Sequence, residues 1–255
     1  MRHSLSFPLC GLVMSAFPIL TGCASTNAGA KPGAESMTLL AEQPATSPLP
    51  PDVELAPLKQ SNTAERRLFI QEGKNAGATI IETWKKEGDR YTLSRRLESS
   101  NEPIEEHTFA LDKQKGLVVE SSIDYVHGVK VEFSPKLVAA PAAGLAPGIA
   151  FKQSPAIRLP TIKNPSKIRE RGTSVREVTY LGDQTVRFRG VTWEAHHCRE
   201  VVTNDLKSAK ATRTTDRWIV DGVGLVAERY EEKVTALGLP IESTVRALVL
   251  LPEGK

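Results

Sequence analysis

Short runs in which β-branched or aromatic residues alternate with polar ones recur along the chain from Leu68 to Leu251. Such alternation places the two kinds of side chain on opposite faces of a β-strand, whereas an amphipathic helix repeats its apolar residues every three to four positions. The helical repeat is scarce after Ser61. The pattern therefore predicts an all-β, or at least β-dominated, antiparallel domain.

The first group of expected strands forms a meander. Gly88, Gly116 and Gly128 lie between neighbouring runs, where tight reversals need them. The runs cover residues 68–72, 78–86, 90–98, 104–111, 117–125 and 129–133.

A proline-rich segment from Ser134 to Pro165 interrupts this pattern. Each proline removes a donor from a β-ladder, so we expect a crossover lid packed over the sheet and not a central strand. Further strands are expected at residues 167–180, 185–189, 191–203, 210–220, 224–233 and 241–251. So many strands joined by hairpins favour one large curved sheet, a half-barrel or an open barrel.

The N-terminus has a different character. A weakly basic start precedes an uncharged apolar stretch from Leu5 to Leu20, which is typical of a secretory signal peptide. The stretch ends in Leu20-Thr21-Gly22-Cys23 and resembles the lipobox of bacterial lipoproteins. The resemblance implies that residues 1–22 are removed and that Cys23 is acylated, which anchors the chain to a membrane. An ordinary signal peptide with Cys23 incidental is the alternative.

The residue after the cysteine bears on the destination. In lipoproteins of double-membraned bacteria an aspartate at this place favours the inner membrane, and this chain has Ala24. We therefore expect an anchor in the outer membrane, with the protein facing the periplasm. Residues 23–60 are rich in Ala, Pro, Ser, Thr and Gly and are expected to form a disordered tether, so that residues 61–255 form the folded domain.

Charge and cysteine content narrow the function further. The formal net charge of +3 is small for this length and argues against a nucleic-acid partner. Of the three cysteines, Cys10 leaves with the signal peptide and Cys23 is acylated, so Cys198 remains alone. The mature chain then has no intrachain disulfide and depends on an apolar core.

The second half of the domain resembles uncharacterised secreted and lipid-anchored β proteins that share the half-barrel of periplasmic lipoprotein carriers. The similarity lies in residues 145–151, in Thr185-Val186 followed by Cys198, and in residues 218–226. Where such proteins bind acyl chains, an apolar concave face does so. The resemblance implies a concave binding face here and assigns no residue to it.

Two groups of residues are candidates for a site. His196, His197 and Cys198 are adjacent possible metal ligands, and in a strand His196 and Cys198 share a face. A zinc site or a cysteine nucleophile is one interpretation, but a small buried cysteine is the simpler one, and no cofactor is expected. Trp84 with Trp193 and Trp218 could line an apolar pocket, although each lies in an alternating run where core packing is usual.

The segment from Lys163 to Arg176 is the most basic part of the chain. It could face anionic lipid or lipopolysaccharide. A solvated strand whose charges protect its edge from aggregation is the simpler interpretation.

These observations predict a non-catalytic envelope lipoprotein that binds an apolar ligand or a partner protein through a curved β domain. An enzyme that uses His196, His197 or Cys198 is the alternative.

Overall fold

The computed structural model describes residues 36–99 and 103–252. The expected signal peptide, the lipobox-like sequence with Cys23 and the first part of the expected tether lie outside these residues. Within them most residues are in β-strands, and there is one short 3-10 helix. The elements are β1 (Thr38–Gln43), η1 (Val53–Leu58), β2 (Thr63–Glu72), β3 (Thr79–Glu87), β4 (Arg90–Leu97), β5 (Pro103–Asp112), β6 (Gly116–Asp124), β7 (Val129–Ser134), β8 (Val138–Pro141), β9 (Phe151–Gln153), β10 (Ala156–Pro160), β11 (Ile168–Phe188), β12 (Val191–Leu206), β13 (Lys210–Val220), β14 (Gly224–Ala236) and β15 (Leu239–Leu250).

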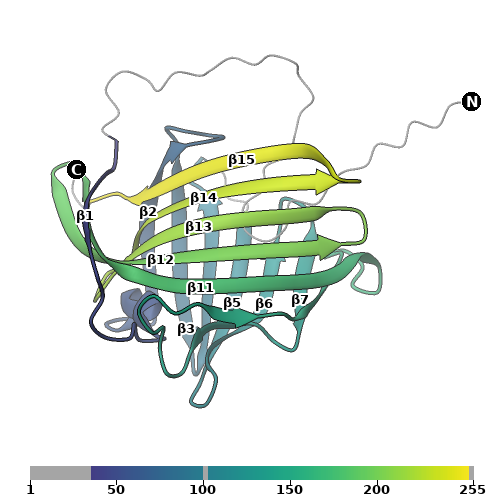
Figure 1. Cartoon of the computed structure of the whole chain (residues 1–255), viewed down its shortest axis with the longest axis horizontal. Helices are drawn as coiled ribbons and strands as arrows, with labels where there is room; N and C mark the ends of the chain where they lie inside the picture. The colour runs from purple at the N-terminus through teal and green to yellow at the C-terminus, as the bar shows by residue number, and fades with distance from the viewer. Residues whose placement is uncertain (1–35, 100–102, 253–255) are drawn as a thin grey trace, which may run out of the picture.

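All strands belong to one antiparallel sheet that curves back on itself. Hydrogen-bonded neighbours run in the order β12, β13, β14, β15, β2, β3, β4, β5, β6, β7, β10 and β11, and β11 also pairs with β12, so the path closes into an uneven ring. Figure 1 shows β11 to β15 as one wall, with β2 to β7 crossing behind it as the other. The predicted all-β, half-barrel-like fold is confirmed.

The meander expected in the first half is confirmed, since β2 to β7 pair in sequence order. In the second half the two runs expected at 167–180 and 185–189 form the single strand β11, with a register shift between Tyr180 and Gly182. Gly182 allows β1 to pass there, because a Cβ at this position would lie 2.2 Å from the carbonyl oxygen of Gln43. The β-bulge accommodates Gly182 and Asp183, which are typical of turns, and the strand continues beyond them.

The proline-rich segment departs from the expectation of a lid without central strands. Its strand β10 lies between β7 and β11 and completes the ring. Pro155 precedes this strand and Pro160 ends it, so residues 156–159 keep their backbone donors. The prolines bound the strand instead of excluding it.

The folded part also begins earlier than Ser61. Strand β1 pairs with β11 at one end of the sheet, seen at the left of Figure 1. Helix η1 follows and packs against β2, β3, β13 and β14. Its buried residues Val53, Leu55 and Leu58 join apolar clusters with residues of both walls. The segment around η1 therefore fills one end of the ring, although its composition is typical of a linker.

No helix among residues 36–99 and 103–252 is long and apolar enough to cross a membrane.

Candidate functional site

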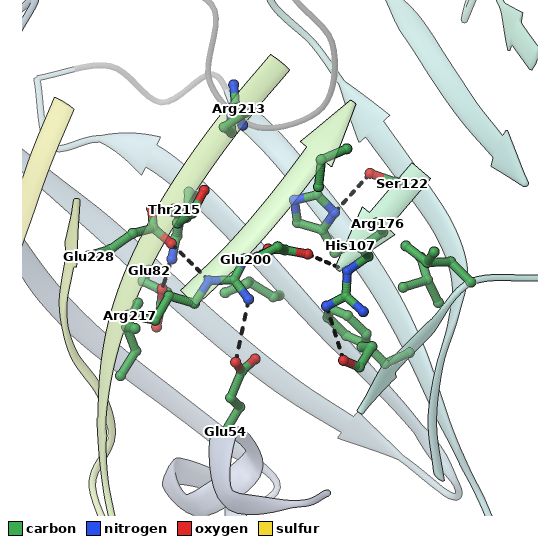
Figure 2. Close-up of a pocket in the computed structure, with 18 of the residues that line it drawn as sticks. Glu54, Glu82, His107, Ser122, Arg176, Glu200, Arg213, Thr215, Arg217 and Glu228 are labelled. Atoms are coloured by element: carbon green, nitrogen blue, oxygen red, sulfur yellow. Dashed lines mark hydrogen bonds and ion pairs between the residues drawn. The ribbon is translucent and has the colours of Figure 1, made fainter. Parts of the chain in front are cut away.

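A cavity of about 100 Å³ lies inside the ring, between its two walls (Figure 2). It is large enough for several waters or a small organic group. Strands β3 to β6 turn one alternating face inward, and this face carries Glu82, Arg95, His107 and Ser122 as well as apolar residues. The apolar residues of this wall and of the adjoining turn region are Trp84, Leu93, Phe109, Val119, Phe133, Leu137 and Ala139.

The opposite wall of the cavity carries mostly polar and charged side chains. Strand β12 contributes Glu200, Val202 and Asn204, and β13 contributes Arg213, Thr215 and Arg217. The spacing of two residues places each set on the inner face of its strand. Arg176 from β11 and Glu228 from β14 complete this side, as the labelled side chains in Figure 2 show.

Arg95 connects the carboxylates of both walls. Its guanidinium lies 2.9 Å from Glu82, 3.1 Å from Glu105 and 3.4 Å from Glu228. Glu82 is also paired with Arg66. Burial alone raises the pKa of Glu82, but the charges of Arg66 and Arg95 outweigh it and lower that pKa to about 2. Burial opposes the charge on Arg95, and its three carboxylate neighbours hold its pKa above the usual range.

Arg217 is a second centre of the network. Its guanidinium lies 3.0 Å from Glu200 and 3.5 Å from both Glu54 and Glu228, so it ties β13 to β12, β14 and η1 (Figure 2). Glu200 also pairs with Arg176. Burial raises the pKa of Glu200, and the two arginines lower it to about 2.

These pairings determine what the cavity can do chemically. Carboxylates with pKa values near 2 stay ionised at neutral pH and are poorly suited to accept a proton from a substrate. Buried charges that are paired in this way fix the shape of a site, because moving either partner exposes an uncompensated charge. The walls therefore form a rigid, charge-compensated surface.

The polar atoms of the lining that have no hydrogen-bond partner among the described residues include Asn204 Oδ1 and His107 Nε2. Asn204 is 3% exposed, and its Oδ1 accepts no hydrogen bond there. A buried acceptor without a donor costs free energy, which a donor from a bound molecule or water offsets. Nearby, His107 Nδ1 lies 2.8 Å from the Ser122 hydroxyl.

The tryptophans expected as pocket residues lie in two places. Trp84 lines the cavity, and its indole N–H donates to Glu82 Oε1 at 2.9 Å. Trp193 and Trp218 pack in an apolar cluster with Phe188 outside the cavity lining. The structure therefore brings only Trp84 to the cavity.

The adjacent histidines point to opposite sides of β12. His196 Nδ1 lies 2.7 Å from the carboxylate of Asp183, to which the Tyr180 hydroxyl also donates. His197 stacks on Trp218 and lies between Glu42 of β1 and Asp216, at 3.2 and 3.0 Å.

Cys198 is buried in an apolar cluster with Val178 and Ile219. Burial raises the pKa of its thiol to about 12. In the part of the chain that the structure describes, no group of three or more His, Cys, Asp or Glu side chains could hold a metal ion. Cys198 is thus packed in β12 as a small apolar side chain, and His196 is partly buried on the same face of the strand.

Sequence reasoning missed the charged network altogether. Its members stand in alternating strands, where charged residues usually face solvent. A signal was nevertheless present in the spacing. Glu82 lies two residues before Trp84, and Arg95 lies two residues after Leu93, so each charged residue shares a face with an apolar one.

Comparison with family models, with curated proteins and with solved structures finds no match for this chain.

Proposed function

We propose that this chain is a lipid-anchored envelope lipoprotein whose ring-shaped β domain binds a small amphipathic ligand without catalysis. The observation that carries the proposal is the interior cavity, whose lining combines apolar side chains with buried polar and charged ones on both walls. Small-molecule sites usually combine apolar surface with polar groups held in fixed positions.

The mixed lining of the cavity suggests how a ligand would lie. An apolar body would pack against Trp84, Leu93 and Phe109. A hydroxyl, amine or amide N–H on the same molecule would donate to Asn204 Oδ1, the acceptor without a partner among the described residues. A purely apolar ligand would leave this buried acceptor without a donor, which favours an amphipathic ligand.

Binding is favoured over catalysis by the electrostatics of the two candidate sites. The cavity carboxylates Glu82 and Glu200 have pKa values of about 2, and the Cys198 thiol has one of about 12. None of these groups changes protonation near neutral pH, where a general acid or base operates most effectively.

The place of action is part of the proposal. Acylation of Cys23 after removal of residues 1–22 would attach the domain to a membrane, and Ala24 after the cysteine favours the outer membrane, facing the periplasm. Gas chromatography or mass spectrometry of the N-terminal peptide from the native host would detect the acyl chains. A peptide that begins elsewhere, or an unmodified Cys23, would contradict this part.

Native mass spectrometry tests the ligand. Residues 24–255 contain every described element of the ring and omit the acylated cysteine. This chain, purified from a secreting host without denaturation, is expected to carry a bound small molecule that leaves when the protein is unfolded. Val202→Phe places extra bulk in the cavity and should abolish the additional mass.

The matched control is Val201→Phe. Val201 is on the opposite face of β12 from the cavity-lining residues Glu200 and Val202, so its replacement should leave the ligand in place. A domain that never carries a small molecule, but copurifies with a specific envelope protein, would replace ligand binding by partner binding.

A further inference from the structure

The hairpin between β14 and β15 has an unusual tip. Its two-residue turn consists of Leu237 and Gly238, since Ala236 pairs with Leu239. Both turn residues have positive φ, 50° and 79°, as in a type I′ turn. Glycine, asparagine or aspartate normally occupies the first of these positions, because a bulky L-residue with positive φ is strained.

The leucine at this position is also almost completely exposed. The exposed fraction of Leu237 is 99%, and those of Leu239 and Ile241 are 68% and 45%. An apolar residue that is both strained and exposed improves neither the stability nor the solubility of the protein. Residues with such backbone strain are concentrated at functional sites. The tip therefore has the character of a contact surface.

Basic residues are in excess at the end of the sheet where this tip lies. Register places the start of β11, the turn between β12 and β13, and the tip at this end, because Gly172 pairs with Leu206 and Lys210 pairs with Thr235. The cations of this end include Arg158, Lys163, Lys167, Arg169, Arg171, Lys207, Lys210 and Lys233, and its carboxylates include Glu132, Glu170, Asp205, Glu231 and Glu242. The excess of cations attracts a negatively charged partner.

The tip lies far from the place where the N-terminal segment joins the sheet. Strand β1 pairs with Asp183 to Arg187 of β11, whereas the tip is level with Gly172 and Thr173. At about 3.3 Å per residue, this separation along the strand is roughly 30 Å or more. In Figure 1, β1 stands at the opposite end of β11 to β15 from the hairpin.

We propose that this end of the domain docks on an anionic lipid bilayer, with Leu237, Leu239 and Ile241 inserted among the lipids and the surrounding lysines and arginines on the headgroups. A bilayer suits a protruding tip, because apolar side chains enter the fluid interface without a preformed groove. Anionic headgroups suit the surrounding cations. This contact is separate from the lipid on Cys23 and from the cavity.

Vesicle flotation tests the proposal on residues 24–255, which lack the acylated cysteine. The chain is expected to float with vesicles that contain phosphatidylglycerol in phosphatidylcholine, and much less with phosphatidylcholine alone or in high salt. Leu237→Asn should weaken the partition by about tenfold, the scale expected when a leucine side chain no longer leaves water. Asparagine accepts positive φ, so the turn itself is retained.

Two further variants make the test specific. Lys207→Gln combined with Lys210→Gln should weaken binding to anionic vesicles by about tenfold or more at low salt. Ile149→Asn is the matched control, because Ile149 is 66% exposed in a turn beside Tyr180, far along β11 from the tip. It should bind as the unchanged chain does.

Three results would overturn the proposal. The first is that the unchanged chain does not float with anionic vesicles, and the second is that Leu237→Asn floats equally well. The third is a dimer, or a complex with an acidic protein, that forms through the tip while vesicles are ignored. A ligand found or missing in the cavity would affect none of these outcomes.

Discussion

The cavity and the His196–Cys198 segment of β12 are both rich in residues that carry out chemistry, yet they differ in how these residues are placed. In the cavity, side chains from both walls converge on Arg95 and Arg217. In the segment, neighbours in the sequence point apart, because a strand alternates its faces. Adjacency in the sequence thus separates the histidines, while distant strands bring the arginines and glutamates together.

The difference also appears in the protonation of the two regions. Pairing keeps Glu82 and Glu200 ionised to about pH 2, and burial keeps the Cys198 thiol protonated to about pH 12. The paired charges of the cavity contribute to the free energy of unfolding in a way that depends on pH. The Cys198 thiol contributes to it as a small apolar group. Acid, substitution and thiol chemistry should therefore affect the two regions differently.

The largest expected effect is acid destabilisation through the cavity. The folded-state pKa values of Glu82 and Glu200 lie near 2, below their ordinary value of 4.5. Their contribution is fully present above about pH 5 and is lost as the pH falls toward 2, about 3 kcal/mol for each carboxylate. Denaturant titrations at several pH values would measure this loss. Cys198→Ala should keep the same pH dependence, and an unfolding free energy that is constant between pH 5 and pH 2 would contradict the prediction.

Replacement of Arg95 should have the next largest effect. Arg95→Met leaves Glu82, Glu105 and Glu228 without their shared cation, which should lower the free energy of unfolding by about 3 to 5 kcal/mol. Arg67→Met is the control, because the Arg67–Glu98 pair is about half-exposed and should contribute below about 1 kcal/mol. Arg95→Lys keeps the charge and should lose less than Arg95→Met, which preserves the test if the methionine variant does not fold. Equal losses at positions 95 and 67 would show that the cavity network is no more important than a surface pair.

How far the sequence predicts this molecule depends on the range of the interactions. Alternation and turn residues are local, and they predict β3 to β7 to within a residue or two, whereas β2 begins at Thr63, five residues before the expected run. The ring requires β10 to pair with β7 and β11, which no local pattern specifies. Likewise, the buried role of η1 depends on the space that distant strands leave for it.

The site was less predictable than the fold for a related reason. Trp84 was a candidate because of its residue type, but Arg95 and Glu228 meet only through the closed sheet, 133 positions apart. Their charges suggested solvent exposure, and only the partners make burial possible. A mixed pattern of charged and apolar residues on one strand face is the local sign of such an interior.

Loss of the Trp84 indole hydrogen bond should have a smaller effect. Trp84→Phe keeps a large apolar ring in the cavity wall but removes the N–H that donates to Glu82. A hydrogen bond to a charged group contributes about 1.5 to 3 kcal/mol, and this loss should appear in chemical denaturation. Trp193→Phe is the control outside the cavity and should not change ligand occupancy in native mass spectrometry. If Trp84→Phe and Trp193→Phe had the same free energy of unfolding and the same ligand occupancy, the indole N–H of Trp84 would have no special role in the ligand site.

The smallest effect should be seen at Cys198, whose chemistry distinguishes the thiol-enzyme alternative from a structural cysteine. The thiolate is the reactive species, and a pKa of about 12 leaves roughly one thiol in ten thousand ionised at pH 8. A thiol reagent followed by absorbance should therefore label the folded protein at least about a thousandfold more slowly than the protein unfolded in guanidinium, where Cys198 regains ordinary exposure. Fast labelling of the folded protein would mean an accessible, activated thiol and would favour catalysis on β12. Slow labelling at pH 8 that accelerates when Arg95→Met destabilises the cavity network would instead show that the cavity and the β12 segment belong to one folding unit.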